Sequence, residues 1–243
     1  MCVTYEPLDT LKSIGSDIWI VDGPAISFYK LPFSTRMTIV RLENGAVWVH
    51  SPIRLTEELA RTIEALGPVI ALIAPNWIHY AYVNEWKERF PDALIYAAPG
   101  VEARAKKHGL DIKVDVHLGQ GAEKAWRGEI AQMIVEGSKV HREAVFFHEA
   151  SKTLILTDLI ENFEPHKLPF FMRLVVRFVG LAAPNGKMPP DMRATFRGNE
   201  SLLRNAVLRM INWRPHRIVV AHGKIIDLDA VAHLRRAFAS VLD

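Results

Sequence analysis

The sequence contains only one cysteine, Cys2, which stands beside the first methionine. One cysteine can form neither an internal disulfide bond nor a zinc site built from several thiolates. Its place at a chain end also makes Cys2 a poor candidate for a catalytic nucleophile. A chain of 243 residues is long enough to bury about three quarters of its unfolded surface without disulfides. We therefore expect a protein of a reducing compartment, the cytoplasm.

Targeting signals, long apolar runs and a large excess of charge are missing as well. The first residues lack the basic start and the continuous apolar core of a secretory signal. The most hydrophobic run, residues 168–181, is shorter than the roughly 20 residues that cross a bilayer, so we expect no transmembrane segment. The formal net charge is only +3 and the basic residues are scattered, which argues against a nucleic-acid partner.

Three sequence motifs of nucleotide-binding and serine-dependent enzymes are also absent. The chain has no Gly-x-Gly-x-x-Gly, no phosphate-binding loop and no Gly-x-Ser-x-Gly nucleophile elbow. Nucleotide-dependent and serine-hydrolase functions are therefore disfavoured. No internal repeat and no linker rich in Gly, Ser or Pro divides the chain, so we expect a single domain over residues 1–243.

What the sequence does contain is an alternation of strand and helix patterns. Residues 37–50 predict a hairpin whose Asn44-Gly45 favours a type I′ turn. Residues 57–66 predict a helix that begins after an N-cap at Thr56. A second hairpin is predicted with its turn at residues 149–152. Further strands are predicted at 69–74, 94–99 and 217–221, and further helices at 82–90, 101–109, 201–211 and 228–241, the last capped by Asp227 or Asp229. This pattern predicts a sheet with helices packed on it, an α/β protein.

Four of the apolar strand patterns run into a histidine or an aspartate: His50, His79, Asp158 and His222. In open α/β sheets, ligand sites lie beyond the carboxyl ends of the strands, where loops converge. Imidazoles and carboxylates are ligands that zinc and other transition metals prefer. Each residue alone is more often a hydrogen-bonded buried group than a ligand. The pattern of the four leaves a common metal site and separate structural roles both open.

Four stretches of the chain add a family resemblance to this pattern. They are residues 33–52 (FSTRMTIVRLENGAVWVHSP), 73–86 (IAPNWIHYAYVNEW), 144–163 (AVFFHEASKTLILTDLIENF) and 219–223 (VVAHG). Through them the chain resembles the metallo-β-lactamase superfamily, and within it an uncharacterised branch known as a domain of unknown function. The resemblance implies an αββα sandwich, in which two central mixed sheets carry helices on their outer sides.

The resemblance also suggests ligands. Asp158 looks like the metal-bridging aspartate of the superfamily, and His222 looks like its late histidine ligand. His79 lies where the superfamily has a His-x-His-x-Asp-His signature, but this chain keeps one histidine there and has Tyr80 beside it. His50 takes the place of an aspartate that supports the site in typical members.

The middle histidine ligand of the superfamily has two candidates here, His148 within a strand and His141 just before it. The preferred ligand set is therefore His79, His148, Asp158 and His222, with His50 and His141 as weaker candidates. The full signature would hold two metal ions, whereas this reduced set is suited to one ion or to none. The ion expected is one zinc, or else iron or manganese.

From these residues we predict a metal-dependent hydrolase of a small ester, lactone or thioester, in which a water activated by the ion is the nucleophile. Tyr80, Glu85 and Glu161 are candidates for proton transfer or for orienting the ligands, against the simpler reading of solvated polar residues. The alternative is a metal-free member of the fold that binds a ligand or partner without catalysis.

The apolar segment 168–181 needs a separate interpretation. Arg173 and Arg177 are four residues apart and so share one face of a helix. The preferred interpretation is an outer helix packed on a sheet. The alternatives are a lid over an apolar substrate, a dimer surface and a helix that lies on a membrane.

Overall fold

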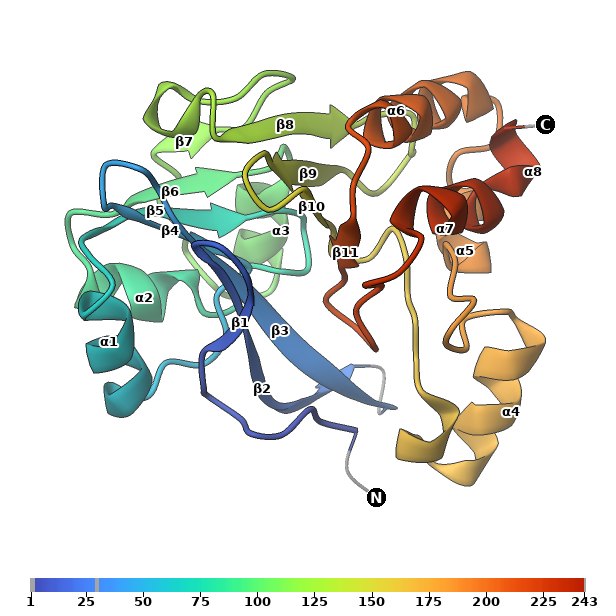
Figure 1. Ribbon diagram of the computed structural model, residues 1–243, viewed down its shortest axis with the longest axis horizontal. Coiled ribbons are helices and arrows are strands. Elements are labelled where there is room, and N and C mark those ends of the chain that lie inside the picture. Colours follow the sequence, from blue (N-terminus) through green and yellow to red (C-terminus); the bar gives the residue numbers. More distant parts are fainter. Residues whose placement is uncertain (1–2, 29–30, 243) are drawn as a thin grey trace.

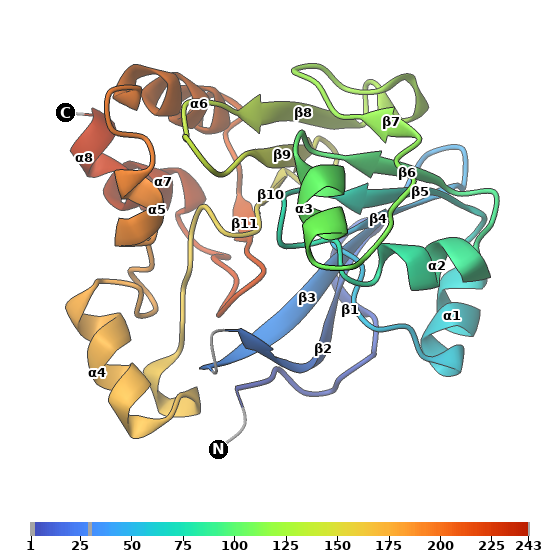
Figure 2. The same cartoon turned by 180° about the vertical axis from the view of Figure 1, so that it is seen from behind.

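The computed structural model describes residues 3–28 and 31–242, so Cys2 lies outside the described residues. Two β-sheets lie face to face at the centre, and helices cover their outer sides (Figure 1). Seen from behind, the same layers remain separate (Figure 2).

The first sheet has seven strands in the order of the chain. Pairing is antiparallel from β1 to β4 and parallel from β4 to β7, so the sheet is mixed. Helices α1 (Glu57–Glu64), α2 (Val83–Arg89) and α3 (Val101–Lys107) connect the parallel strands. The strands are β1 (Lys12–Gly15), β2 (Ile18–Phe28), β3 (Leu31–Arg41), β4 (Val47–His50), β5 (Val69–Ala74), β6 (Leu94–Ala97) and β7 (Val116–His117).

The second sheet has four strands in the order β11-β10-β9-β8 and is also mixed, because β10 is parallel to β11 and antiparallel to β9. The strands are β8 (Ile130–Val135), β9 (Glu143–His148), β10 (Thr153–Ile155) and β11 (Arg217–Val219). The remaining helices are η1 (Lys124–Trp126), η2 (Pro165–Lys167), α4 (Phe170–Phe178), α5 (Pro190–Ala194), α6 (Glu200–Asn212), α7 (Ala230–Ala237) and α8 (Ala239–Leu242).

Strand β9 shows how the layers are held together, because both of its faces are buried. Ala144 and Phe146 join the core that fills the space between the two sheets. Val145 and Phe147 point the other way and join the core formed with α6 and α7. Alternation of side chains along a strand therefore gives one sheet two apolar faces, one toward the partner sheet and one toward helices. The predicted αββα sandwich of two mixed sheets is confirmed.

Local predictions are mostly confirmed, with two corrections. Thr56 caps α1 as expected, since its hydroxyl accepts a hydrogen bond from the backbone of Leu59 at 3.2 Å. The hairpin of residues 37–50 forms, but its turn is not type I′. Gly45 has a φ of +82° while Asn44 stays outside the left-handed region, which makes a three-residue loop. Asp229 stands at the N-cap of α7 without a side-chain capping bond, so the expected cap is missing.

The apolar segment 168–181 forms the helix α4. Met172 and Val176 of α4 pack into a small separate cluster, and neither of the two main cores includes α4. Phe33 of β3 packs against this cluster, so the helix predicted to pack on a sheet forms, but its contact with the sheet is limited to one end of a strand. Among the described residues, every helix is too short or too polar to cross a membrane.

Candidate metal centre

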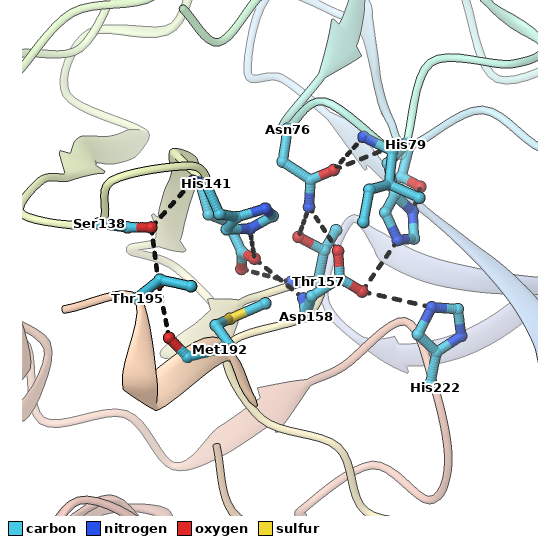
Figure 3. A network of polar contacts seen from close by, with 12 residues as sticks. Asn76, His79, Ser138, His141, Thr157, Asp158, Met192, Thr195 and His222 are labelled. Carbon is cyan, nitrogen blue, oxygen red and sulfur yellow. Dashed lines mark hydrogen bonds and ion pairs between the residues drawn. The ribbon is translucent and has the colours of Figure 1, made fainter. Parts of the chain in front are cut away.

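Three of the residues predicted at strand ends meet at one edge of the sandwich (Figure 3). His79 follows β5 of the first sheet, whereas Asp158 and His222 follow β10 and β11 of the second. Asp158 Oδ1 lies 3.2 Å from His79 Nε2 and 3.3 Å from His222 Nε2. One ligand atom from each of the three residues lies within 4.8 Å of the others, a spacing that fits a shared metal ion.

The second ring nitrogen of each histidine is already held by the protein. His222 Nδ1 lies 2.8 Å from the backbone oxygen of Ser34, which can only accept, so Nδ1 carries the proton. His79 Nδ1 lies 2.8 Å from Ser51 Oγ. Hydrogen bonds of this kind fix the ring orientation of metal-binding histidines. Both Nε2 atoms are thereby directed at Asp158.

Asp158 and the two histidines need a proton or a cation between their facing atoms. Burial alone would raise the pKa of Asp158, but His79 and His222 hold it well below its usual value, so the group is a carboxylate. Burial lowers the pKa of His222, and the Asp158 carboxylate outweighs it and raises that pKa overall. A carboxylate oxygen and an imidazole nitrogen at this distance are stable only with a proton or a cation between them. The donor set therefore fits a metal ion.

Asn76 ties the His79 loop to Asp158. Its side-chain nitrogen donates to Asp158 Oδ2 at 2.6 Å and to Thr157 Oγ1 at 2.9 Å. Its side-chain oxygen accepts from the backbone of Ile78 at 2.9 Å and of His79 at 3.0 Å. One buried amide thus fixes the loop and occupies the second oxygen of Asp158.

Behind Asp158, Glu143 holds the backbone in place. The side chain of Glu143 is fully buried and accepts from the backbone of Thr157 at 2.8 Å and of Asp158 at 2.9 Å. His141 Nε2 lies 3.5 Å from Glu143 Oε2. His141, Glu143 and Asp158 also place ligand atoms within 4.8 Å of one another, although Glu143 is engaged with the backbone.

The loop that carries His222 is fixed by Arg36. Arg36 Nη1 donates to the backbone oxygens of Val220 at 2.8 Å and Gly223 at 2.7 Å. Gly223 has a φ of +101°, and a side chain there would collide with the backbone of Asn162, so glycine is required. In the Ala-His-Gly sequence, the glycine is therefore needed for the turn, and the histidine is the candidate ligand.

A cavity of about 330 Å³ adjoins the three residues, and its walls are mainly apolar. Glu161 and Tyr80 are polar groups in its wall. Burial raises the pKa of Glu161 to about 7, with Asp158 and Asp191 adding to the effect and His222 opposing it. The apolar lining includes Ile26, Phe33, Ile53, Ile78, Leu181 and Met192.

The other predicted site residues lie elsewhere. His148 is at the far end of β9 from Glu143, and its Nδ1 lies 2.7 Å from Ser151 Oγ. Glu85 is exposed on α2, accepts from the backbone of Leu55 at 3.3 Å and does not line the cavity. Neither residue is brought to the centre by the structure. His148 lies away from the centre because of the direction of β9, and Glu85 because it is on the exposed face of α2. The sequence pattern had left both the strand direction and the helix face open.

His50 is buried next to the centre but outside the ligand group. Its ring stacks on Trp48 at a centroid distance of 5.5 Å, and its Nε2 has no hydrogen-bond partner among the described residues. Burial, with a smaller effect from His79, lowers the pKa of His50 to about 3. His50 is therefore a neutral ring at physiological pH.

Sequence reasoning missed Ser51, Asn76 and Glu143. Ser51 follows a strand-end histidine, and Asn76 opens the loop that leads to His79, so their positions offered a signal. Ser51 also has a φ of +54°, which is uncommon for serine and sets its direction toward His79. No pattern in the sequence indicated that His222 would contact the backbone of Ser34.

The family described as Domain of unknown function (DUF4336) matches residues 16–179, more than half of the chain. The chain belongs to this family. No curated protein matches this chain.

Solved structures of metallo-β-lactamases are similar to this chain over nearly its full length. One is DIM-1 exposed to ceftazidime, with a TM-score of 0.66 at 14% identity, covering 95% of this chain and 96% of that one. The enzyme from Pontibacter korlensis has a TM-score of 0.64 at 15% identity, covering 95% and 98%. FIM-1 from Pseudomonas aeruginosa in its mono-zinc form has a TM-score of 0.62 at 12% identity, covering 96% of each chain. At these identities the likeness shows the fold alone.

Proposed function

We propose that this protein is a metal-dependent hydrolase of a small molecule, with one ion held by His79, Asp158 and His222. The observation that carries the proposal is the convergence of His79 Nε2 and His222 Nε2 on Asp158 Oδ1, at 3.2 and 3.3 Å. When bound, such an ion polarises a substrate carbonyl and brings the pKa of a water toward about 7. Zinc is the first candidate, and iron and manganese accept the same ligands.

A single ion is favoured over a pair by the surroundings of the second Asp158 oxygen. The amide nitrogen of Asn76 donates to Asp158 Oδ2 at 2.6 Å, so this oxygen is already engaged and the N–H group disfavours a cation beside it. Glu143 uses its oxygens on two backbone N–H groups, and His141 rests against it. The group of His79, Asp158 and His222 is thus suited to a cation. In the group of His141, Glu143 and Asp158, the side chains already hydrogen-bond one another or the backbone.

The cavity supplies the remaining parts of a hydrolytic site. Glu161 lines the same cavity, and burial raises its pKa, so it is suited to passing a proton to a leaving group. Tyr80 stands in the same wall and is suited to orienting a polar substrate atom. The apolar lining favours a compact substrate with a hydrophobic part. We therefore propose an ester, lactone or thioester as the substrate class.

The proposal is tested by the metal content of the protein purified without a histidine tag or chelators. We expect about one zinc, iron or manganese ion per chain, lost in Asp158→Ala and His222→Ala and retained in His148→Ala. His148 is a matched control because it is also a buried histidine bonded to a serine but lies away from the centre. Absence of metal after incubation with a slight excess of zinc, or equal loss in the control, would overturn the proposal.

One observation favours a second candidate, a metal-free member that binds a ligand without catalysis. Asp158 and the two histidines also satisfy one another directly when a proton lies between Asp158 and His222. In that case a proton takes the place of the cation. The zinc titration decides between the two candidates, since the metal-free protein would show no binding that depends on His222.

A further inference from the structure

Helix α4 presents an uncovered apolar stripe at the surface. The exposed fractions are 93% for Phe178, 72% for Phe171, 71% for Phe170, 52% for Leu174 and 41% for Val175. These five residues follow the spacing of one helix face, and we call them the α4 stripe. Scattered exposed apolar residues are ordinary, but a continuous stripe with three phenylalanines marks a binding surface.

The stripe stays uncovered because α4 is attached by its opposite side. Met172 and Val176 pack with Phe163, Leu168 and Leu181, and these contacts leave the stripe facing outward. Both ribbon views place α4 at the periphery of the molecule, away from the helices that cover the sheets (Figures 1 and 2). The helix is therefore held in place while its larger apolar face has no partner among the described residues.

The charged side chains of α4 itself are both basic. Residues 165–190 contain four lysine or arginine residues, and the nearest acidic residues in the sequence, Glu164 and Asp191, stand just outside this range. Arg177 is exposed and borders the stripe, and Arg173 precedes it on the same side of the helix. The others are Lys167 and Lys187. An apolar stripe bordered by positive charge is complementary to a partner that has an anionic outer layer and an apolar interior beneath it.

We propose that α4 docks on an anionic lipid bilayer and lies in the plane of its interface. The helix has nine residues, about 13 Å of length, which is far too short to cross the membrane. In the interfacial position, the phenylalanines enter the boundary of the acyl chains while the exposed Arg177 meets the headgroups. Docking also places the cavity near the bilayer, because Leu181 belongs both to the cluster under α4 and to the cavity wall.

A second copy of the chain fits this surface less well. In a symmetric dimer the same patch meets itself, so Arg177 would approach its own counterpart. Helix α4 has no acidic side chain of its own that could neutralise the pair, since Glu164 and Asp191 lie outside it. Anionic headgroups supply the missing negative charge. An anionic lipid bilayer therefore fits the α4 stripe better than a second copy of the chain does.

The test is co-sedimentation of the full chain with vesicles of phosphatidylcholine alone and of phosphatidylcholine mixed with phosphatidylserine. We expect binding to the mixed vesicles at low salt, weaker binding to phosphatidylcholine alone, and at least a tenfold loss in the double variant Phe171→Ser/Phe178→Ser. Leu228→Ser is the matched control, since Leu228 is 78% exposed but lies outside α4. Arg177→Gln should weaken binding to the mixed vesicles, and Arg235→Gln should leave it unchanged.

Three results would overturn the assignment. The first is no binding to the mixed vesicles at low salt, and the second is equal loss in Leu228→Ser and in the phenylalanine variant. The third is a concentration-dependent dimer in analytical ultracentrifugation that the phenylalanine variant abolishes, which would assign the stripe to a second copy. Circular dichroism of each variant checks that it is folded. Metal content is measured in parallel and should not change in the α4 variants, so membrane docking and the metal centre succeed or fail separately.

Discussion

The side-chain nitrogen of Asn76 lies 2.6 Å from Oδ2 of Asp158, and this contact joins the two sheets at the candidate metal centre. Asn76 follows β5 of the first sheet and Asp158 follows β10 of the second. The same amide accepts two backbone hydrogen bonds from the loop that carries His79. Asn76 is therefore a positioning residue for two of the three candidate ligands.

Replacing Asn76 by alanine should lower both stability and metal affinity. The change leaves one oxygen of Asp158 and two backbone N–H groups without their partner, and buried unsatisfied groups cost about 1–3 kcal/mol each. We expect a loss of a few kcal/mol in the free energy of unfolding, measured with urea. Asn84→Ala is the control, because Asn84 bonds only one backbone oxygen, at 2.7 Å, in a more exposed position. Equal losses in the two variants would contradict the role given to Asn76.

Removing the hydroxyl of Ser51 should weaken metal binding without unfolding the protein. Ser51 Oγ lies 2.8 Å from His79 Nδ1 and sets the orientation of the ring. Loss of such a partner lowers metal affinity by about tenfold to a hundredfold. We expect this loss for Ser51→Ala in a zinc titration against a competing chelator. Ser151→Ala removes the matching serine from His148, at 2.7 Å, and should leave zinc affinity unchanged. A result in which both variants bind zinc like the unmodified chain would dismiss Ser51 as a positioning residue.

Three residues of the candidate metal centre could be foreseen from the sequence. The strand-end positions of His79, Asp158 and His222 were visible as patterns, because apolar runs lead directly into them. That the carboxyl ends of β5 in one sheet and of β10 and β11 in the other meet at one edge follows from the sandwich, which the family resemblance supplied. The metal-binding role itself stays a prediction.

Strand direction explains why His148, grouped with the ligands through the family resemblance, lies away from them. Strand β9 is antiparallel to β10, so its carboxyl end, where His148 lies, points away from Asp158. Glu143, at the start of the same strand, reaches the centre instead. The exposure of the larger apolar face of α4 was not foreseen, for a different reason. Its pattern shows an apolar face, and a pattern cannot tell whether that face meets a sheet or solvent.

His50 should make the protein sensitive to acid. Its pKa in the folded chain is about 3, below the ordinary value of 6.5, because the buried ring resists protonation. The unfolded chain therefore binds a proton between these two values while the folded chain does not, so stability falls as pH drops from 6.5 toward 3. Between pH 7 and about pH 4.5 this single group should account for about 2–3 kcal/mol.

The variant His50→Leu isolates this effect, because it keeps an apolar side chain beside Trp48 and removes the titratable group. We expect its free energy of unfolding to fall less steeply than that of the unmodified chain over the same pH range. Urea unfolding at several pH values measures the difference between the two proteins. Parallel pH profiles would show that His50 does not resist protonation in the folded chain.

The last prediction concerns the buried ion pair that supports the His222 loop. Arg36 and Asp22 are 2.8 Å apart, and their side chains are only 3% and 2% exposed. Arg36→Met leaves the Asp22 carboxylate with Lys12 as its remaining basic partner, and breaking a buried pair in this way costs about 3–5 kcal/mol. It also removes the donors to the backbone on both sides of His222, so zinc affinity should fall together with stability.

A double variant separates the two effects of Arg36. Adding Asp22→Asn to Arg36→Met removes the unpaired charge, and part of the lost stability should return, as measured by urea unfolding. Zinc affinity should not return, because the loop still lacks its two hydrogen bonds. Full recovery of zinc affinity in the double variant would mean that Arg36 acts on the His222 loop only through the charge of Asp22.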